Sequence, residues 1–295
     1  MIYFTLPNFN TNSKINFIIS NIANINPEKI KEPIKFIANS GNYPYCYFNG
    51  SINNCYGDLI KYFDYQVICN QYMDNKNAIR LNLTNAFLTS KDFDNSLLDV
   101  ILSTHHTGSC YIELNNLALK NYIEDKYPNY QFIYSMPYDN NNHIMTPDLI
   151  NQLNDENIFD LITIPFNYIK DISFLKKIKN KSKIELTVNN LCKNCDLVQS
   201  EICSLKENEL QSNYSGTSLL SNCDKRVPYT DSTVITLEEI VQKYNAIGIK
   251  HYKLVDFFQN PCNTIDFINF IIDYFIKDEY KNEIRTLMLK EVFAQ

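Results

Sequence analysis

The feature that most constrains this chain is the alternation of short β-type patterns with longer helical patterns along most of its length. Short runs rich in β-branched and aromatic residues predict strands. These predicted strands span residues 2–6, 34–38, 65–69, 78–83, 110–114, 131–135, 159–164, 183–188 and 251–255. The predicted helices span residues 26–34, 91–103, 117–127, 146–154, 169–178 and 236–248, with a further pair from residue 263 onward.

Strands that alternate with helices are typical of parallel sheets with crossover helices, and about eight such units predict an α/β fold of the TIM-type (β/α)8 barrel class. An open, doubly wound sheet is the alternative. A chain of 295 residues with 45% hydrophobic content can bury the core that a barrel needs. We expect one barrel domain over residues 1–295, with C-terminal helices 263–295 packed on it.

Local signals at three helix ends support this reading. Thr146 is followed by a proline at the first helical position, which is a common helix start. Thr236 is followed three residues later by Glu239, the spacing of a capping box. Gly248 then predicts the end of the same helix.

Charge and hydropathy limit the partners that we expect. The formal charge of −6 argues against non-specific binding to duplex DNA or to an anionic bilayer, because both favour dense lysine and arginine. The N-terminal residues do not resemble a secretory signal. Asp266 and Asp273 interrupt the most apolar late segment, which argues against a membrane span. We therefore expect a cytoplasmic protein.

In a parallel barrel, the loops that follow the strands build the active site. Several polar residues follow predicted strands and would surround one mouth of the barrel: Thr84, Asn85, Asn115, Asn116, Asn167, Asn189 and Asn190. The alternative is that these residues only form turns. By the same rule, His105 and His106 precede a strand and would lie at the opposite face, while His143 and His251 are isolated and fit structural roles.

Alternation within the strands predicts a second polar group. If Ile79, Leu81 and Leu83 face the helices, the residues that alternate with them along the strand face the barrel interior. The charged residues placed inside in this way are Arg80, Glu113, Glu185 and Lys253. Buried charges require partners, so we expect a paired interior network. Its role is either structural pairing or acid–base chemistry and substrate anchoring.

The longest irregular stretch, residues 189–234, holds four of the nine cysteines. Cys192, Cys195, Cys203 and Cys223 have the spacing C-x2-C-x7-C-x19-C. Thiols in the cytoplasm stay reduced, so four clustered cysteines indicate a metal site and not a set of disulfides. Four thiolates suit an iron–sulfur cluster or zinc, and incidental reduced thiols are the remaining alternative.

Two motifs resemble the collagenase-like peptidase (peptidase U32) family. They are KIELTVNNLCKNC at 183–195 and TLEEIVQKYNAIGIKHYKLVDF at 236–257, with a weaker similarity in residues 40–54. The resemblance implies a TIM-like barrel in which the four cysteines bind a 4Fe–4S cluster, and Lys253 matches the basic residue of the family's final strand. The cysteine spacing is shorter than is usual there, and Phe257 and Phe258 stand where a Gly-Arg pair is common.

Some members of that family support oxygen-independent hydroxylation of RNA bases or of the ubiquinone ring, and others are classed as peptidases. The resemblance therefore predicts an iron–sulfur enzyme that acts on a small molecule, a peptide or an RNA base. Its candidate substrate-orienting residues are Asn115, Asn189 and Lys253. The alternatives are a peptidase or zinc hydrolase, and a non-catalytic partner subunit with a structural four-cysteine metal site.

Overall fold

The structure is a computed structural model of the chain. It describes residues 1–7, 9–42, 78–83, 93, 99, 102–103, 110–135, 145–164, 166–189, 234–254 and 263–293. The predicted strand at 65–69 lies outside these residues.

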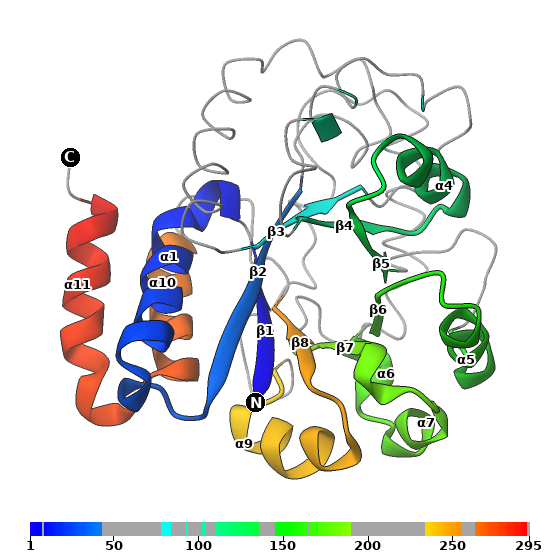
Figure 1. The fold of residues 1–295 in the computed structure, drawn as a ribbon. Helices are drawn as coiled ribbons and strands as arrows, with labels where there is room; N and C mark the ends of the chain where they lie inside the picture. The colour runs from blue at the N-terminus through cyan, green and yellow to red at the C-terminus, as the bar shows by residue number, and fades with distance from the viewer. Residues whose placement is uncertain are drawn as a thin grey trace, which may run out of the picture.

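Eight parallel strands form a closed barrel (Figure 1). They are β1 (Ile2–Leu6), β2 (Ile34–Asn42), β3 (Ala78–Asn82), β4 (Cys110–Leu114), β5 (Gln131–Ser135), β6 (Leu161–Ile164), β7 (Ile184–Thr187) and β8 (His251–Lys253). Each strand pairs in parallel with the next, and β8 pairs with β1 to close the sheet. The predicted TIM-type fold is therefore confirmed, and each strand overlaps a segment predicted from the sequence, although β2 extends four residues beyond the predicted end.

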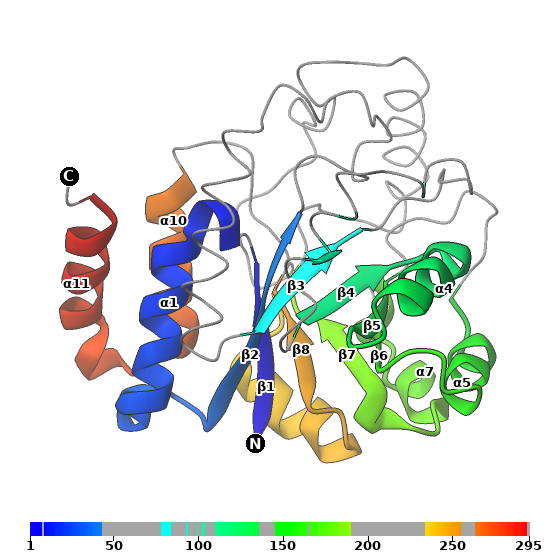
Figure 2. The ribbon, with the colours of Figure 1, turned by 45° about the horizontal axis from the view of Figure 1, so that its top comes forward.

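The helices lie on the outside of the sheet, as the turned view shows (Figure 2). The α-helices are α1 (Phe9–Ile25), α4 (Leu117–Lys126), α5 (Pro147–Asp155), α6 (Phe166–Ile169), α7 (Ile172–Lys177), α9 (Leu237–Glu239), α10 (Asn263–Phe275) and α11 (Lys281–Phe293). The helix of α9 continues as a π-type turn at Ile240–Tyr244 and a 3-10 turn at Asn245–Ile247.

The predicted helix starts are confirmed by hydrogen bonds. The Thr146 hydroxyl accepts from the Leu149 N–H at the start of α5. Thr236 and Glu239 form both bonds of a capping box, each 3.2 Å long. These side chains satisfy N–H groups that have no partner within the helix.

One helix prediction is wrong and one helix was overlooked. Residues 26–34 form only a short 3-10 turn at Pro27–Lys29, followed by an isolated bridge between Ile30 and Ile276. Pro33 explains why a helix cannot continue there, because proline lacks the N–H that a helix interior needs. The overlooked helix is α1, whose asparagine-rich start hid the helical spacing of its buried face, Ile15, Ile19 and Ile22.

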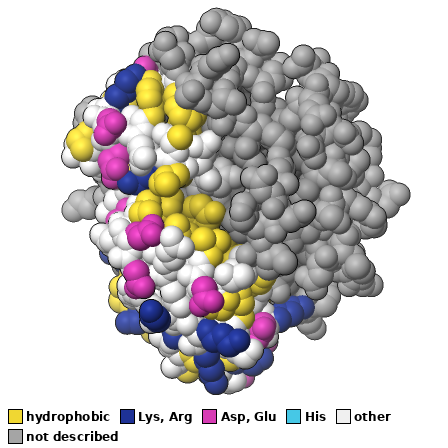
Figure 3. Space-filling view, turned by 90° about the vertical axis from the view of Figure 1, so that its right-hand side faces the viewer, with side chains coloured by type: hydrophobic (Ala, Val, Ile, Leu, Met, Phe, Trp, Pro, Cys, Tyr) yellow, Lys and Arg dark blue, Asp and Glu magenta, His cyan; other side chains and the backbone are white. Residues whose placement is uncertain are grey.

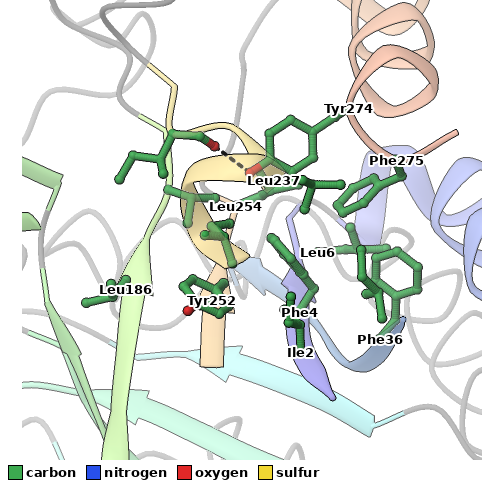
Figure 4. Close-up of a cluster of buried hydrophobic side chains, with 14 of the residues drawn as sticks. Ile2, Phe4, Leu6, Phe36, Leu186, Leu237, Tyr252, Leu254, Tyr274 and Phe275 are labelled. Carbon is green, nitrogen blue, oxygen red and sulfur yellow. Dashed lines mark hydrogen bonds between the residues drawn. The ribbon is translucent and has the colours of Figure 1, made fainter. Parts of the chain in front are cut away.

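The largest hydrophobic cluster among the described residues packs β1, β2, β6, β7 and β8 against the surrounding helices, and Figure 4 shows part of it. Phe4 packs edge-on against Phe275 with ring centroids 5.1 Å apart. The Tyr274 hydroxyl donates a 2.6 Å hydrogen bond to the backbone carbonyl of Ile235. A second cluster packs β3, β4 and β5 against α4. The outward face of the sheet is thus apolar, which leaves the inward face for the polar residues.

Gly248 ends the helix before β8, as predicted, with a φ of +98°. We expect Gly248→Ala to lower the free energy of unfolding by about 1 kcal/mol, because a left-handed φ strains residues that carry a Cβ. An added Cβ would lie 3.8 Å from Lys181 Cβ, an ordinary contact, so the cost arises in the backbone. Urea unfolding would measure it. Gly248→Asn is the control and should cost less, because asparagine tolerates this region.

The outer surface of the described residues carries mixed charges. Acidic and basic side chains are interspersed on the side that holds α4, α5 and α7, with hydrophobic side chains between them (Figure 3). On the described part of this side there is no continuous basic surface of the kind that binds a nucleic-acid backbone. Among the described helices, none has the length and apolar character needed to cross a membrane.

Candidate active site

Four charged side chains from four strands meet inside the barrel: Arg80 on β3, Glu113 on β4, Glu185 on β7 and Lys253 on β8. We call them the charged tetrad. The apolar residues that alternate with them, such as Leu81 and Leu186, are fully buried on the helix-facing side. The interior network predicted from strand alternation is therefore confirmed.

Arg80 links the two carboxylates of the tetrad. Its Nη1 donates to both carboxylate oxygens of Glu185 at 2.8 and 2.7 Å. Its Nε lies 2.8 Å from Oε2 of Glu113, in an ion pair whose geometry is not that of an aligned hydrogen bond. Lys253 Nζ donates to the two oxygens of Glu113 at 2.7 and 2.6 Å. The four charges thus form one chain from Glu185 to Lys253.

Hydroxyl groups complete the shell around the carboxylates. Thr5 and Thr163 donate to the oxygens of Glu185 at 3.1 and 2.9 Å. The Thr163 hydroxyl also accepts from Arg80 Nη2 at 3.0 Å. Ser135 hydrogen bonds to Glu113. We did not name these three hydroxyls from the sequence, although the alternation that located Arg80 also places Thr5 between the buried Phe4 and Leu6.

Burial separates the tetrad into an inner part and an outer end. The side chains of Arg80 and Glu185 are 0% exposed, that of Glu113 is 2% exposed and that of Lys253 is 9% exposed. Lys253 is also the last residue of β8, and it lies in register with Thr187, the last residue of β7. Lys253 is therefore the member of the tetrad that lies at the carboxyl end of its strand, the end where barrel enzymes hold their active sites.

The environment shifts the pKa values of the tetrad. Burial opposes ionisation of Glu113, but the charges of Arg80 and Lys253 outweigh it and lower the pKa to about 2. Burial lowers the pKa of Lys253, and Arg80 lowers it further, while Glu113 opposes the change. For Arg80, burial disfavours the charge, but Glu113 and Glu185 together raise the pKa. Shifted ionisable groups of this kind are typical of functional sites as well as of buried ion-pair networks.

Below the tetrad, on the amino-terminal side, two rings stack inside the barrel. The ring of His251 lies 5.0 Å from that of Tyr3, with an angle of 19° between the planes. Burial lowers the pKa of His251, although the charge of Glu185 raises it. His251 Nδ1 is buried and has no hydrogen-bond partner among the described residues. Tyr3 and His251 are both partly exposed at this end of the barrel.

The asparagines predicted at the mouth have different surroundings. Asn116 caps α4, since its side chain accepts from the Leu119 N–H at 3.0 Å, so this residue has the turn-forming role that we named as the alternative. Asn115 is half-buried directly after β4, and Asn189 is 0% exposed and pairs with Val234 through an isolated bridge.

Most of the remaining sequence candidates lie outside the described residues. These are Thr84, Asn85, Asn190, His105, His106, His143 and the four cysteines Cys192, Cys195, Cys203 and Cys223, and the side chain of Asn167 is also not described. Among the described residues, no group of three or more His, Cys, Asp or Glu side chains could hold a metal ion. The described cysteine Cys110 is buried, and burial raises the pKa of its thiol to about 11, so it is a poor thiolate ligand.

The backbone around Asn189 shows where the cysteine-bearing stretch is attached. Val188 N–H donates to the Lys253 carbonyl at 2.9 Å, and Ile235 N–H donates to the Val188 carbonyl at 2.8 Å. Asn189 and Val234, the described residues on either side of the stretch 190–233, thus lie side by side next to the end of β8. Both anchors of the stretch 190–233 lie at the same end of the barrel as Lys253.

No protein-family model matches this chain, and no curated protein matches it either. Several solved structures, however, are similar to it in fold. A probable 3-DHS dehydratase, AsbF, involved in petrobactin synthesis in Bacillus anthracis, aligns over 100% of both chains with 12% identity and a TM-score of 0.50. A xylose isomerase domain-containing protein from Salmonella typhimurium aligns over 99% of this chain and 97% of its own, with 11% identity and a TM-score of 0.47. What this chain shares with the first of these is the fold, a TIM-type α/β barrel.

Proposed function

We propose that this chain is an enzyme that acts on a small molecule at the carboxyl end of its barrel, with Lys253 contacting the substrate. The observation that carries the proposal is the position of the charged tetrad. Purely structural layers of a barrel are filled by branched apolar side chains, whereas this interior holds four fully or almost fully buried charges. Their outermost member, Lys253, lies at the end where barrel enzymes bind substrates.

The tetrad supplies charged groups for orienting a substrate. Arg80 holds Glu113 and Glu185 in place through contacts of 2.7 to 2.8 Å, and Thr5 and Thr163 restrict Glu185 further. A group whose surroundings are locked in this way is preorganised, which is the main contribution that a protein makes to catalysis. Asn115 and Asn189 remain our candidates for orienting the substrate, together with Lys253.

We further propose that Cys192, Cys195, Cys203 and Cys223 hold a 4Fe–4S cluster, as the resemblance to the U32 family implies. One fact supports the place of such a cluster beside the tetrad. Cys192 follows Asn189 by three residues, which limits their Cα separation to about 11 Å. A cluster there would supply electrons for redox or hydroxyl-transfer chemistry next to the tetrad.

Metal analysis of protein purified without oxygen tests the iron–sulfur part. We expect about four irons per chain and broad absorbance near 400 nm, since four thiolates bind one such cluster. Cys192→Ala should lose most of the iron. Cys110→Ala is the matched control and should keep it, because Cys110 lies on β4 in the buried core.

The result separates the alternatives. If the purified protein is colourless and holds one zinc, the four cysteines form a structural zinc site. If it holds no metal, they are four reduced thiols. Either outcome would refute the iron–sulfur proposal. Neither would affect the role of the tetrad, because its four charged members contain no cysteine and pair with one another.

A further inference from the structure

The charge count of the tetrad restricts what can bind beside it. Arg80 and Lys253 carry two positive charges, and Glu113 and Glu185 carry two negative ones, so the buried group is neutral as a whole. An added carboxylate or phosphate would leave one uncompensated negative charge in a region from which water is largely excluded. Buried charge without a partner is costly. The tetrad therefore favours an uncharged polar group.

Lys253 is the member that such a group would meet. Its side chain has the largest exposed fraction of the four, 9%, and it extends from the last residue of β8. Two contacts to Glu113, at 2.7 and 2.6 Å, hold its nitrogen in one place. A lysine amine held at the mouth of a barrel can bind an uncharged carbonyl compound in two ways, through a hydrogen bond or through a covalent bond from nitrogen to carbon.

We propose that Lys253 forms an imine with an uncharged aldehyde or ketone. This deepens the proposed function, since it rests on the mouth of the barrel being the substrate site and names the substrate class. The nitrogen bonds to the carbonyl carbon and the bond from that carbon to oxygen breaks. Two of the three ammonium hydrogens leave with the oxygen as water, and the third stays on the iminium nitrogen. No oxidant or reductant is needed.

The tetrad suits the product of this step. An ammonium and an iminium each carry one positive charge, so the buried group stays neutral when one replaces the other. The remaining N–H of the iminium can still donate to Glu113, whose pKa of about 2 keeps it ionised as the acceptor. Glu113 is thus a positioning residue for Lys253.

Reductive trapping tests the proposal with two three-carbon ketones, dihydroxyacetone, which is uncharged, and pyruvate, which is an anion. Each is added with sodium cyanoborohydride, and peptide mass spectrometry measures labelling at Lys253 and at Lys179, whose side chain is 72% exposed. We expect the ratio of Lys253 to Lys179 labelling to be about tenfold higher with dihydroxyacetone than with pyruvate, since one unpaired charge costs more than 1 kcal/mol. Using Lys179 as the reference removes the difference in intrinsic reactivity between the ketones.

Variants show whether the tetrad causes this labelling. Glu113→Gln should lower the labelling of Lys253 by about tenfold, because the charge that stabilises the iminium is lost. Glu124→Gln is the matched control, since Glu124 also pairs with a lysine, Lys120, but is 49% exposed. It should leave the ratio unchanged. Lys253→Arg should remove the label at residue 253 and keep that at Lys179.

Unlabelled Lys253 in folded wild-type protein, at a dihydroxyacetone concentration that fully labels Lys179, would overturn the proposal without any variant. Equal labelling ratios for the two ketones would overturn the preference for uncharged compounds. The outcome is independent of the metal analysis. Labelling at Lys253 in protein without iron refutes only the cluster, whereas iron-containing protein without labelling refutes only the imine.

Discussion

Replacing Arg80 with methionine should lower the free energy of unfolding by about 3–5 kcal/mol, the cost typical of breaking a buried ion pair from one side. Arg80 is 0% exposed and contacts both Glu113 and Glu185. Methionine keeps much of the side-chain volume, so the loss comes mainly from two carboxylates that no longer have their shared partner. Urea unfolding followed by circular dichroism would measure the difference.

The double variant Arg80→Met with Glu185→Gln shows whether charge is the cause. It removes one charge of each sign, so it should be more stable than Arg80→Met alone. Lys243→Ala breaks the exposed ion pair with Glu239 and is the surface control, with an expected cost of about 0.5 kcal/mol or less. A cost below about 1 kcal/mol for Arg80→Met would contradict the view that the tetrad depends on its buried charges.

Acid should destabilise the protein through Glu113. Its pKa falls from an ordinary value of 4.5 to about 2 in the folded protein. The folded state therefore binds this proton less readily than the unfolded state does. The stabilisation is fully present above about pH 5 and is lost as the pH falls through 2, and a shift of this size corresponds to about 3 kcal/mol.

Measuring the free energy of unfolding at several pH values between about 5 and 2 would test this linkage. Wild-type protein should lose about 3 kcal/mol more over the range than Glu113→Gln, which cannot titrate at that position. Glu124→Gln serves as the control, because its carboxylate is half exposed and solvent screens its charge. Parallel curves for the wild type and Glu113→Gln would show that Glu113 does not contribute in this way.

The two experiments also bear on function. If breaking the ion pairs of the tetrad lowers the free energy of unfolding by several kcal/mol, the tetrad is a rigid part of the barrel. Rigid surroundings of this kind hold catalytic groups in place. Lys253 is the member that reaches the end of the strands, and both ends of the stretch with the four cysteines are attached beside it. The proposed cluster and the proposed imine therefore concern the same end of the barrel, although each has its own test.

Several features of this protein could be predicted from residues that are close in sequence. Alternation in AIRLNL and KIELTV placed Arg80 and Glu185 inside the barrel, because neighbouring side chains of a strand point to opposite faces. The cap at Thr236 and the end of the helix at Gly248 depend on a few adjacent residues. The helix α1 escaped prediction because its first turn is rich in asparagine and threonine, which compete with helix formation.

By itself, the sequence determined the order of the eight described strands, the parallel barrel and the four charges that face its interior. Only the tertiary structure decided that Arg80 contacts both carboxylates, that Lys253 pairs with Glu113 across 140 positions of sequence, and that Asn116 caps a helix. The reason is geometric. Which interior side chains meet depends on the tilt and stagger of strands around a closed sheet, and no local periodicity encodes these quantities.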